Sequence, residues 1–140
     1  MIMSTRRKKF YEDQYASLSV VESIPCVKVK LSGFPRGSDH YQYVQTKLLE
    51  TIRDQASNYC KLHLLTDNTE AGLVLEEDMT YFKSNIIPAM EEAGIRYHAI
   101  VLPQNFFGTV IKTQTSLSNR KLKVAYFDTV TRASKWLKKQ

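Results

Sequence analysis

The sequence has few cysteines and no long apolar run, and each shortage excludes a class of protein. Its 140 residues include only Cys26 and Cys60, and neither has a second cysteine at metal-binding spacing. Two isolated cysteines cannot build a disulfide framework. The longest apolar runs, 24–27 and 99–102, are much shorter than a membrane span. No apolar stretch follows the basic N-terminus as in a secretory signal, so we expect a cytoplasmic protein with reduced thiols.

Common catalytic motifs are also missing. The sequence contains no glycine-rich phosphate loop and no Gly-x-Ser-x-Gly nucleophile elbow. Of the three histidines, His63 and His98 lie in apolar segments, where a hydrogen-bonded core histidine is more common than a base or a metal ligand. The acids at 76–78 fall in the first turn of an expected helix, where the helix dipole favours them. We therefore predict a protein that is not an enzyme and that needs no cofactor or metal.

Positive charge is in excess, but it is concentrated at the two ends of the chain. The net charge is +6, and residues 6–9 alone contribute four positive charges. Residues 120–140 hold seven basic residues against one acid. No aromatic residue interleaves with residues 6–9 to stack on bases, so we do not expect nucleic-acid binding. We expect residues 1–12 to form a basic flexible arm and residues 13–140 to form a single domain.

Apolar periodicity places the strands. Alternation predicts strands at 15–21 and 25–31, and the polar residues between them suit a tight turn of an antiparallel hairpin. A short apolar strand is expected at 62–65 and an alternating one at 122–127. The stretch 97–102 carries no charge, which indicates a strand covered on both faces, with Ala99, Val101 and Leu102 buried.

Helical spacing of apolar residues predicts helices at 41–59, at 75–93 with a kink at Pro88, at 106–111, and after Asp128. In the last helix Ala133, Trp136 and Leu137 are expected to face the sheet. The resulting order is ββαβαβαβα. Helices that alternate with apolar strands require parallel crossovers. The predicted fold class is therefore α/β, with a single mixed, mostly parallel sheet covered by helices.

Three blocks of the second half of the chain resemble a known family. They are residues 64–67 with 75–78, residues 93–103, and residues 126–128 with 133–137. Together they resemble the small stand-alone STAS-like proteins of the SpoIIAA-like group, which include anti-sigma-factor antagonists and are related in architecture to CRAL-TRIO lipid-binding domains. The resemblance covers residues 15–137 and consists of fold signatures rather than catalytic ones.

The resemblance draws attention to the segment LLTDNTEAG at 64–72. Partner-switching antagonists of the family carry a phosphorylated serine in an Asp-Ser-Ser/Thr-Gly turn after the third strand. Here the acid is present as Asp67, but Asn68 and Thr69 follow it, and no serine occurs between Cys60 and Met79. We expect Asp67 to close an Asx turn, Thr69 to be accessible, and the loop 67–72 to be the functional edge.

By resemblance, the function implied is that of a non-catalytic STAS-like regulatory or protein-binding module in signal transduction, with a protein partner or self-association. The alternative is a small-ligand binding domain, for a lipid or a nucleotide, that uses a cleft between helix and sheet. Five apolar residues could line such a cleft: Tyr81, Phe82, Met90, Phe106 and Phe107. The candidate residues for binding are thus Asp67, Asn68, Thr69, Phe106 and Phe107.

Overall fold

The computed structural model describes residues 7–72, 74–103 and 121–140, and its centre is one six-stranded sheet. The strands lie side by side in chain order: β1 (Arg7–Glu12), β2 (Ala16–Val21), β3 (Cys26–Gly33), β4 (His63–Ala71), β5 (Tyr97–Val101) and β6 (Lys123–Phe127). The pairs β1–β2 and β2–β3 are antiparallel, and the remaining three pairs are parallel. The predicted α/β class with a mixed, mostly parallel sheet and the predicted hairpin are therefore confirmed.

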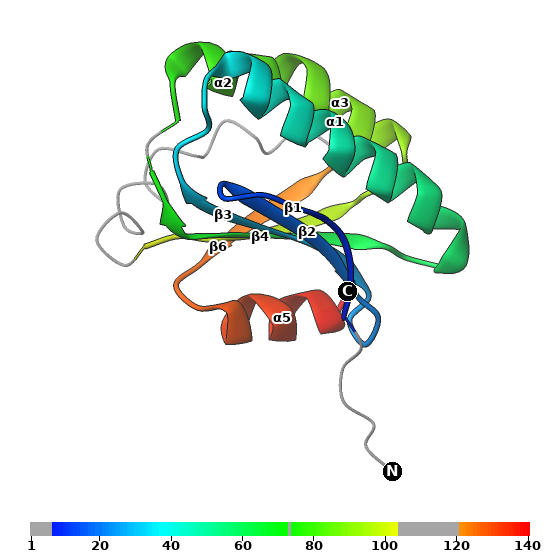
Figure 1. The fold of residues 1–140 in the computed structure, drawn as a ribbon. Coiled ribbons are helices and arrows are strands. Elements are labelled where there is room, and N and C mark those ends of the chain that lie inside the picture. The colour runs from blue at the N-terminus through cyan, green and yellow to red at the C-terminus, as the bar shows by residue number, and fades with distance from the viewer. Residues whose placement is uncertain (1–6, 73, 104–120) are drawn as a thin grey trace.

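Helices cover both faces of the sheet (Figure 1). The helical segments are α1 (Ser38–Gln55), the 3₁₀ turn η1 (Ala56–Asn58), α2 (Glu76–Tyr81), the π-helical turn η2 (Phe82–Ile86), α3 (Ile87–Glu92) and α5 (Val130–Lys138). The first three α-helices pack on one face, and α5 packs on the other (Figure 1). The helix predicted at 106–111 lies outside the described residues. In the described ranges, no helix combines the length and the apolar character needed to cross a membrane.

The first strand differs from the expectation. Residues 7–12, predicted as part of a flexible arm, form β1, which pairs with β2 along one edge of the sheet. Phe10 and Tyr11 are partly buried against the core, and their burial accounts for the ordered strand. A bulge between Lys9 and Tyr11 interrupts the pairing, as is common at sheet edges. The arm prediction is therefore wrong for residues 7–12; residues 1–6 lie outside the described part.

Each face of the sheet has its own apolar core. Neighbouring residues of a strand point to opposite faces, and so Leu64 belongs to the core under α1 while Leu65 belongs to the core under α5. The α1 side also contains Leu18, Val27, Val29, Leu48, Ile52 and Met90. The α5 side also contains Cys26, Ala99, Val101, Ala133 and Leu137. Both faces of the central strands are consequently hidden from water, as their near-continuous apolar sequence requires.

Strand β5 lies between β4 and β6 and is buried as predicted, with one exception. Ala99 and Val101 are fully buried. Leu102 is only partly buried, because the strand ends at Val101 and Leu102 already begins the exit from the sheet. Its backbone N–H still donates to the carbonyl of Phe127, at 2.9 Å. The prediction is confirmed for Ala99 and Val101 and wrong for Leu102.

The helical stretch at 76–92 is interrupted next to Pro88. In the turn η2 the backbone N–H of Ile87 donates to the carbonyl of Phe82, five residues earlier instead of four. Proline has no N–H to donate and clashes with the preceding turn of a regular helix. The wider π turn directly before Pro88 avoids this clash. The sequence predicted a kink at Pro88, and the structure has a π turn there that separates α2 from α3.

Helix α5 docks on the sheet as predicted. The Thr129 side chain accepts a hydrogen bond from the backbone N–H of Arg132 and so caps the helix start, at 3.2 Å. Ala133 and Leu137 are fully buried on the inner face. The Trp136 ring contacts two aromatic rings of the sheet, Tyr97 and Phe127, with centroid distances of 5.7 and 5.6 Å. These contacts hold the helix to β5 and β6.

Candidate functional site

The predicted candidate residues Asp67, Asn68 and Thr69 lie inside β4 rather than in a loop. β4 continues to Ala71, and Glu70 and Ala71 still pair with the end of β3. Between Asp67 and Glu70 the register shifts, because two β4 residues lie opposite a single residue of β3. The expectation of a loop at 67–72 is therefore wrong. A bulged strand end occupies this position, and it carries the pairing further along the sheet.

Asp67 holds this bulge in place. Its Oδ1 accepts a hydrogen bond from the backbone N–H of Thr69 at 3.0 Å and another from the Thr69 hydroxyl at 2.7 Å. The first is the hydrogen bond of an Asx turn, as predicted, although it forms within the strand and not at its end. Asp67 is buried and Thr69 is exposed, which agrees with the expected placement. The Asp67 carboxylate is thus engaged in backbone structure.

The aromatic cleft proposed from the sequence does not assemble from the described residues. Phe106 and Phe107 lie outside the described ranges. Met90 is fully buried, and Tyr81 and Phe82 are partly buried against the α1-side core. Met90 is thus part of the core and the two aromatic side chains pack against it, as apolar side chains at helical spacing usually do.

An exposed apolar patch lies where β3 and β4 end and α2 begins. We call Phe34, Val74, Leu75 and Met79 the carboxyl-edge patch. Phe34 and Leu75 are 68% and 58% exposed, and Val74 and Met79 are also exposed. The Phe34 ring packs directly against the backbone of Gly72, which has no side chain to obstruct it. Leu75 and Met79 are one helical turn apart at the start of α2. Phe34 and Val74 follow the neighbouring ends of β3 and β4, where Gly33 pairs with Ala71, and so all four residues lie at this edge of the sheet. The sequence signal for it was the run of apolar residues directly after LLTDNTEAG.

A polar cluster that the sequence did not reveal joins the β1–β2 turn to the start of α1. His40 and Asp13 are 27 positions apart in the chain, and His40 Nε2 lies 2.6 Å from Asp13 Oδ2. The backbone N–H of Arg36 donates to His40 Nδ1 at 2.9 Å, which places the imidazole proton on Nε2. Tyr11 donates its hydroxyl hydrogen to the same Asp13 oxygen. No local periodicity connects these residues, and only the fold brings them together.

The charge of Asp13 is stabilised within this cluster. Burial alone would raise the pKa of its carboxyl, but hydrogen bonds from Tyr11, His40 and two backbone N–H groups outweigh it and hold the pKa well below its usual range. The hydrogen bond to Asp13 raises the pKa of Tyr11 to about 12. Both ring nitrogens of His40 are engaged with protein groups. The arrangement is therefore a structural clamp and has no free base to accept a substrate proton.

Asp78 lies in the first turn of α2, as predicted, but unlike Glu76 and Glu77 it is buried. Its side chain is buried, and its Oδ1 has no hydrogen-bond partner among the described residues. The charge of Asp78 acts on two tyrosines, Tyr15 directly before β2 and Tyr41 on α1. Burial first, and then Asp78, raise the pKa of Tyr15 to about 12, and burial is also the largest cause that raises the pKa of Tyr41. The predicted placement of acids in the first helical turn is confirmed for all three residues at 76–78.

The strand histidines are core residues, as predicted. The ring of His98 is fully enclosed, and its Nε2 lies 2.8 Å from the Thr66 hydroxyl on β4. Burial lowers the pKa of His98 to about 3. His63 is also buried, with its ring against Tyr97, and burial lowers its pKa as well. Both histidines are neutral at physiological pH and inaccessible to a substrate.

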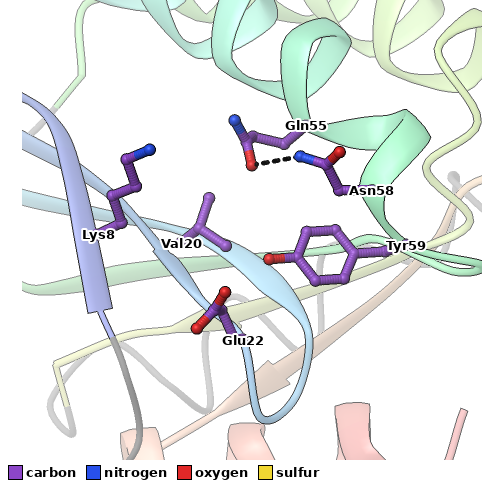
Figure 2. Close-up of a pocket in the computed structure, with 6 residues that line it drawn as sticks. All are labelled: Lys8, Val20, Glu22, Gln55, Asn58 and Tyr59. Carbon is purple, nitrogen blue, oxygen red and sulfur yellow. Dashed lines mark hydrogen bonds between the residues drawn. The ribbon is translucent and has the colours of Figure 1, made fainter.

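A cavity of about 290 Å³ opens at the other end of the sheet (Figure 2). Two sheet strands and the end of α1 form its walls. Its lining residues are Lys8, Val20, Glu22, Gln55, Asn58 and Tyr59. Most of this lining is polar, and it includes one cation and one anion. The cavity therefore suits a small polar molecule better than a lipid chain.

Comparisons with family models, curated proteins and solved structures find no match to this chain. Within residues 7–72, 74–103 and 121–140, no three histidine, cysteine or acidic side chains gather as metal ligands. The functional argument consequently rests on the geometry of the carboxyl-edge patch and of the cavity.

Proposed function

We propose that this protein is a non-catalytic regulatory module that binds a protein partner through the carboxyl-edge patch. The observation that carries the proposal is the exposure of Phe34, Val74, Leu75 and Met79 at one edge. Large exposed apolar side chains are costly in water when they gather, and such gatherings mark docking surfaces. Aromatic and methionine side chains are also enriched in the buried centres of protein interfaces.

The polar clusters support a non-catalytic role. The Asp13 carboxylate and both nitrogens of His40 are used in the clamp, and Asp67 is used in the β4 bulge. The resemblance to STAS-like proteins of the SpoIIAA-like group supports a regulatory role in signal transduction, in which binding rather than chemistry is the activity. A cytoplasmic location belongs to the same proposal.

The test compares two aromatic substitutions. Phe34→Ser removes the most exposed ring of the patch, and Tyr43→Ser removes an exposed ring on α1 that lies outside it. Each variant is used as bait beside the wild-type protein in native cells, and self-association is followed by sedimentation. We expect Phe34→Ser to weaken partner binding or self-association about tenfold or more, because central apolar anchors dominate interface energies. We expect Tyr43→Ser to leave binding unchanged. A wild-type protein that stays monomeric and captures nothing specific would refute the proposal.

A second function, small-ligand binding in a cleft between helix and sheet, is supported by a different observation. The cavity beside β1 and β2 has helix α1 as its other wall, which is the kind of cleft that this function needs. Its polar lining favours a polar ligand over the lipid considered from the sequence. Native mass spectrometry of freshly purified protein tests this function, since a bound small molecule adds a defined mass.

A further inference from the structure

The cavity brings together side chains from the β1–β2 edge of the sheet and from the end of α1. Lys8 comes from β1, Val20 from β2 and Glu22 from the turn after it, while Gln55 and Asn58 come from the end of α1 and from η1. Figure 2 shows Lys8 on its strand and Glu22 at the turn below the helix end, with the Tyr59 ring on the opposite side from Lys8. The charged groups and the amides thus converge on one space from different directions.

Lys8 and Glu22 give the cavity one positive and one negative group that do not neutralise each other. Both residues lie in the described part of the chain, and no ion pair joins them. The Lys8 ammonium lies 5.4 Å from the centre of the Phe10 ring, which stabilises a cation without supplying a counter-charge. Both residues are exposed to solvent at the mouth of the cavity, and a ligand with a single charge would pair with only one of them.

Uncharged groups complete the lining. The Asn58 amide donates to the Gln55 side-chain oxygen at 3.2 Å, which fixes both amides at the helix end. The Tyr59 hydroxyl is directed toward Val20 and Glu22 (Figure 2). Burial, and then the charge of Glu22, raise the pKa of this phenol, so it remains a neutral hydrogen-bond donor. Val20 is buried and forms the apolar floor.

We propose that this cavity binds a small zwitterion of the amino-acid class, with its carboxylate at Lys8 and its ammonium group at Glu22. The inference rests on the second proposed function and names its ligand class. A volume of about 290 Å³ is at the lower limit of ligand pockets, and it accommodates a molecule of the size of an amino acid. A molecule with both charges pairs with both side chains at once. The charges of Lys8 and Glu22 sum to zero, and so the cavity matches a ligand whose own charges also sum to zero.

The experiment titrates the full-length, isotopically labelled protein with individual amino acids and follows backbone amide resonances by NMR. The matched probes are a simple alkylamine, a short carboxylate and glycerol, each at about 10 mM, ten times a millimolar Kd. We expect one or more amino acids to shift the resonances of Glu22, Gln55, Asn58 and Tyr59 selectively. We expect Lys8→Gln and Glu22→Gln each to weaken this binding about tenfold, the usual effect of losing a charged hydrogen bond.

Lys9→Gln is the control variant, because Lys9 is on the same strand but pairs with Glu12, outside the cavity. It should bind as the wild type does. If glycerol or a singly charged probe shifts the same resonances as strongly as any amino acid, the zwitterion assignment is wrong but the cavity remains a ligand site. If no probe shifts them, both the assignment and the small-ligand function are refuted. Unchanged melting temperatures of the Lys8 and Glu22 variants show that any loss comes from the site.

Discussion

At the scale of single residues, the Asp67 carboxylate stabilises the bulge of β4. It accepts hydrogen bonds from the backbone N–H and the hydroxyl of Thr69, which would lose this acceptor if Asp67 were replaced. The variant Asp67→Ala removes both hydrogen bonds to Thr69, and we expect it to lower the free energy of unfolding by about 1–3 kcal/mol. The variant Asp67→Asn retains a side-chain oxygen that can accept both, and we expect a loss below about 1 kcal/mol. Urea unfolding of the two variants measures the difference. Equal losses would show that the charge, and not the acceptor, stabilises the bulge.

Thr69 is placed unfavourably for phosphorylation. Its hydroxyl already donates to Asp67, and a phosphate there would lie beside that carboxylate and next to Glu70. A dianion near like charges loses free energy by repulsion instead of gaining it from pairing. We therefore predict that the protein isolated from its native cell carries no stoichiometric phosphate on Thr69, as measured by intact-mass and peptide mass spectrometry. Stoichiometric phosphate would restore the partner-switching scheme of the STAS-like antagonists.

His98 makes stability depend on pH. The unfolded chain protonates this ring near pH 6.5, but the folded protein does so only near 3, because burial lowers the pKa. Between these values the unfolded state binds more protons, and so the free energy of unfolding falls as the pH falls. We expect a loss of about 2 kcal/mol at pH 5 relative to pH 7 from His98, with a further loss from His63. Urea unfolding at both pH values measures it, and imidazole resonances of folded His98 that titrate near 6.5 would contradict it.

At the scale of elements, α5 depends on its aromatic contact with the sheet. Trp136 is partly buried between Tyr97 and Phe127, and so we expect Trp136→Ala to cost about 3 kcal/mol, at the lower end for a tryptophan. Lys135 is exposed on the same helix, and Lys135→Ala should change the free energy of unfolding by less than about 0.5 kcal/mol. Thermal unfolding compares the two. A Trp136→Ala variant as stable as the wild type would show that the helix is not docked through this ring.

The clamp between Asp13 and His40 explains how the elements at the sheet edge are connected. Asp13 belongs to the β1–β2 turn, and its Oδ1 accepts hydrogen bonds from the backbone N–H groups of Tyr15 and Ala16. Its other oxygen is held by His40 at the start of α1. One carboxylate therefore orients the hairpin and the helix together. Because α1 ends at the cavity, the clamp also positions the cavity wall relative to β1 and β2.

At the scale of the whole molecule, the two proposed sites lie at opposite ends of the sheet. Val21 pairs with Cys26 at the start of β3, beside the cavity, whereas Phe34 follows the end of the same strand. We therefore predict that the sites act independently. Phe34→Ser should leave amino-acid binding to the cavity unchanged within about 0.5 kcal/mol, and Glu22→Gln should leave partner binding unchanged. Coupled losses, measured by titration of each variant with both ligands, would show that the sites communicate through the fold.

Local patterns accounted for most of the elements. The alternation at 25–31 identified β3, and the uncharged stretch at 97–102 identified a strand covered on both faces. Helical spacing identified α1 and α5, and Pro88 marked the break between α2 and α3. These features depend on neighbours within a few positions, since the repeat of each element is two or 3.6 residues. β1 was not predicted, because the basic residues at 6–9 suggested a solvated arm, whereas Phe10 and Tyr11 pack against the core and order the strand.

The sequence alone thus determined the α/β class, the hairpin and the buried central strand, because burying the apolar faces of these segments requires a covered sheet. Only the tertiary structure decided which polar groups meet. The approach of His40 to Asp13, the buried charge of Asp78 near Tyr15 and Tyr41, and the cavity between Lys8 and Tyr59 all involve residues far apart in the chain. Such contacts follow from strand order and helix placement, and no local periodicity encodes them.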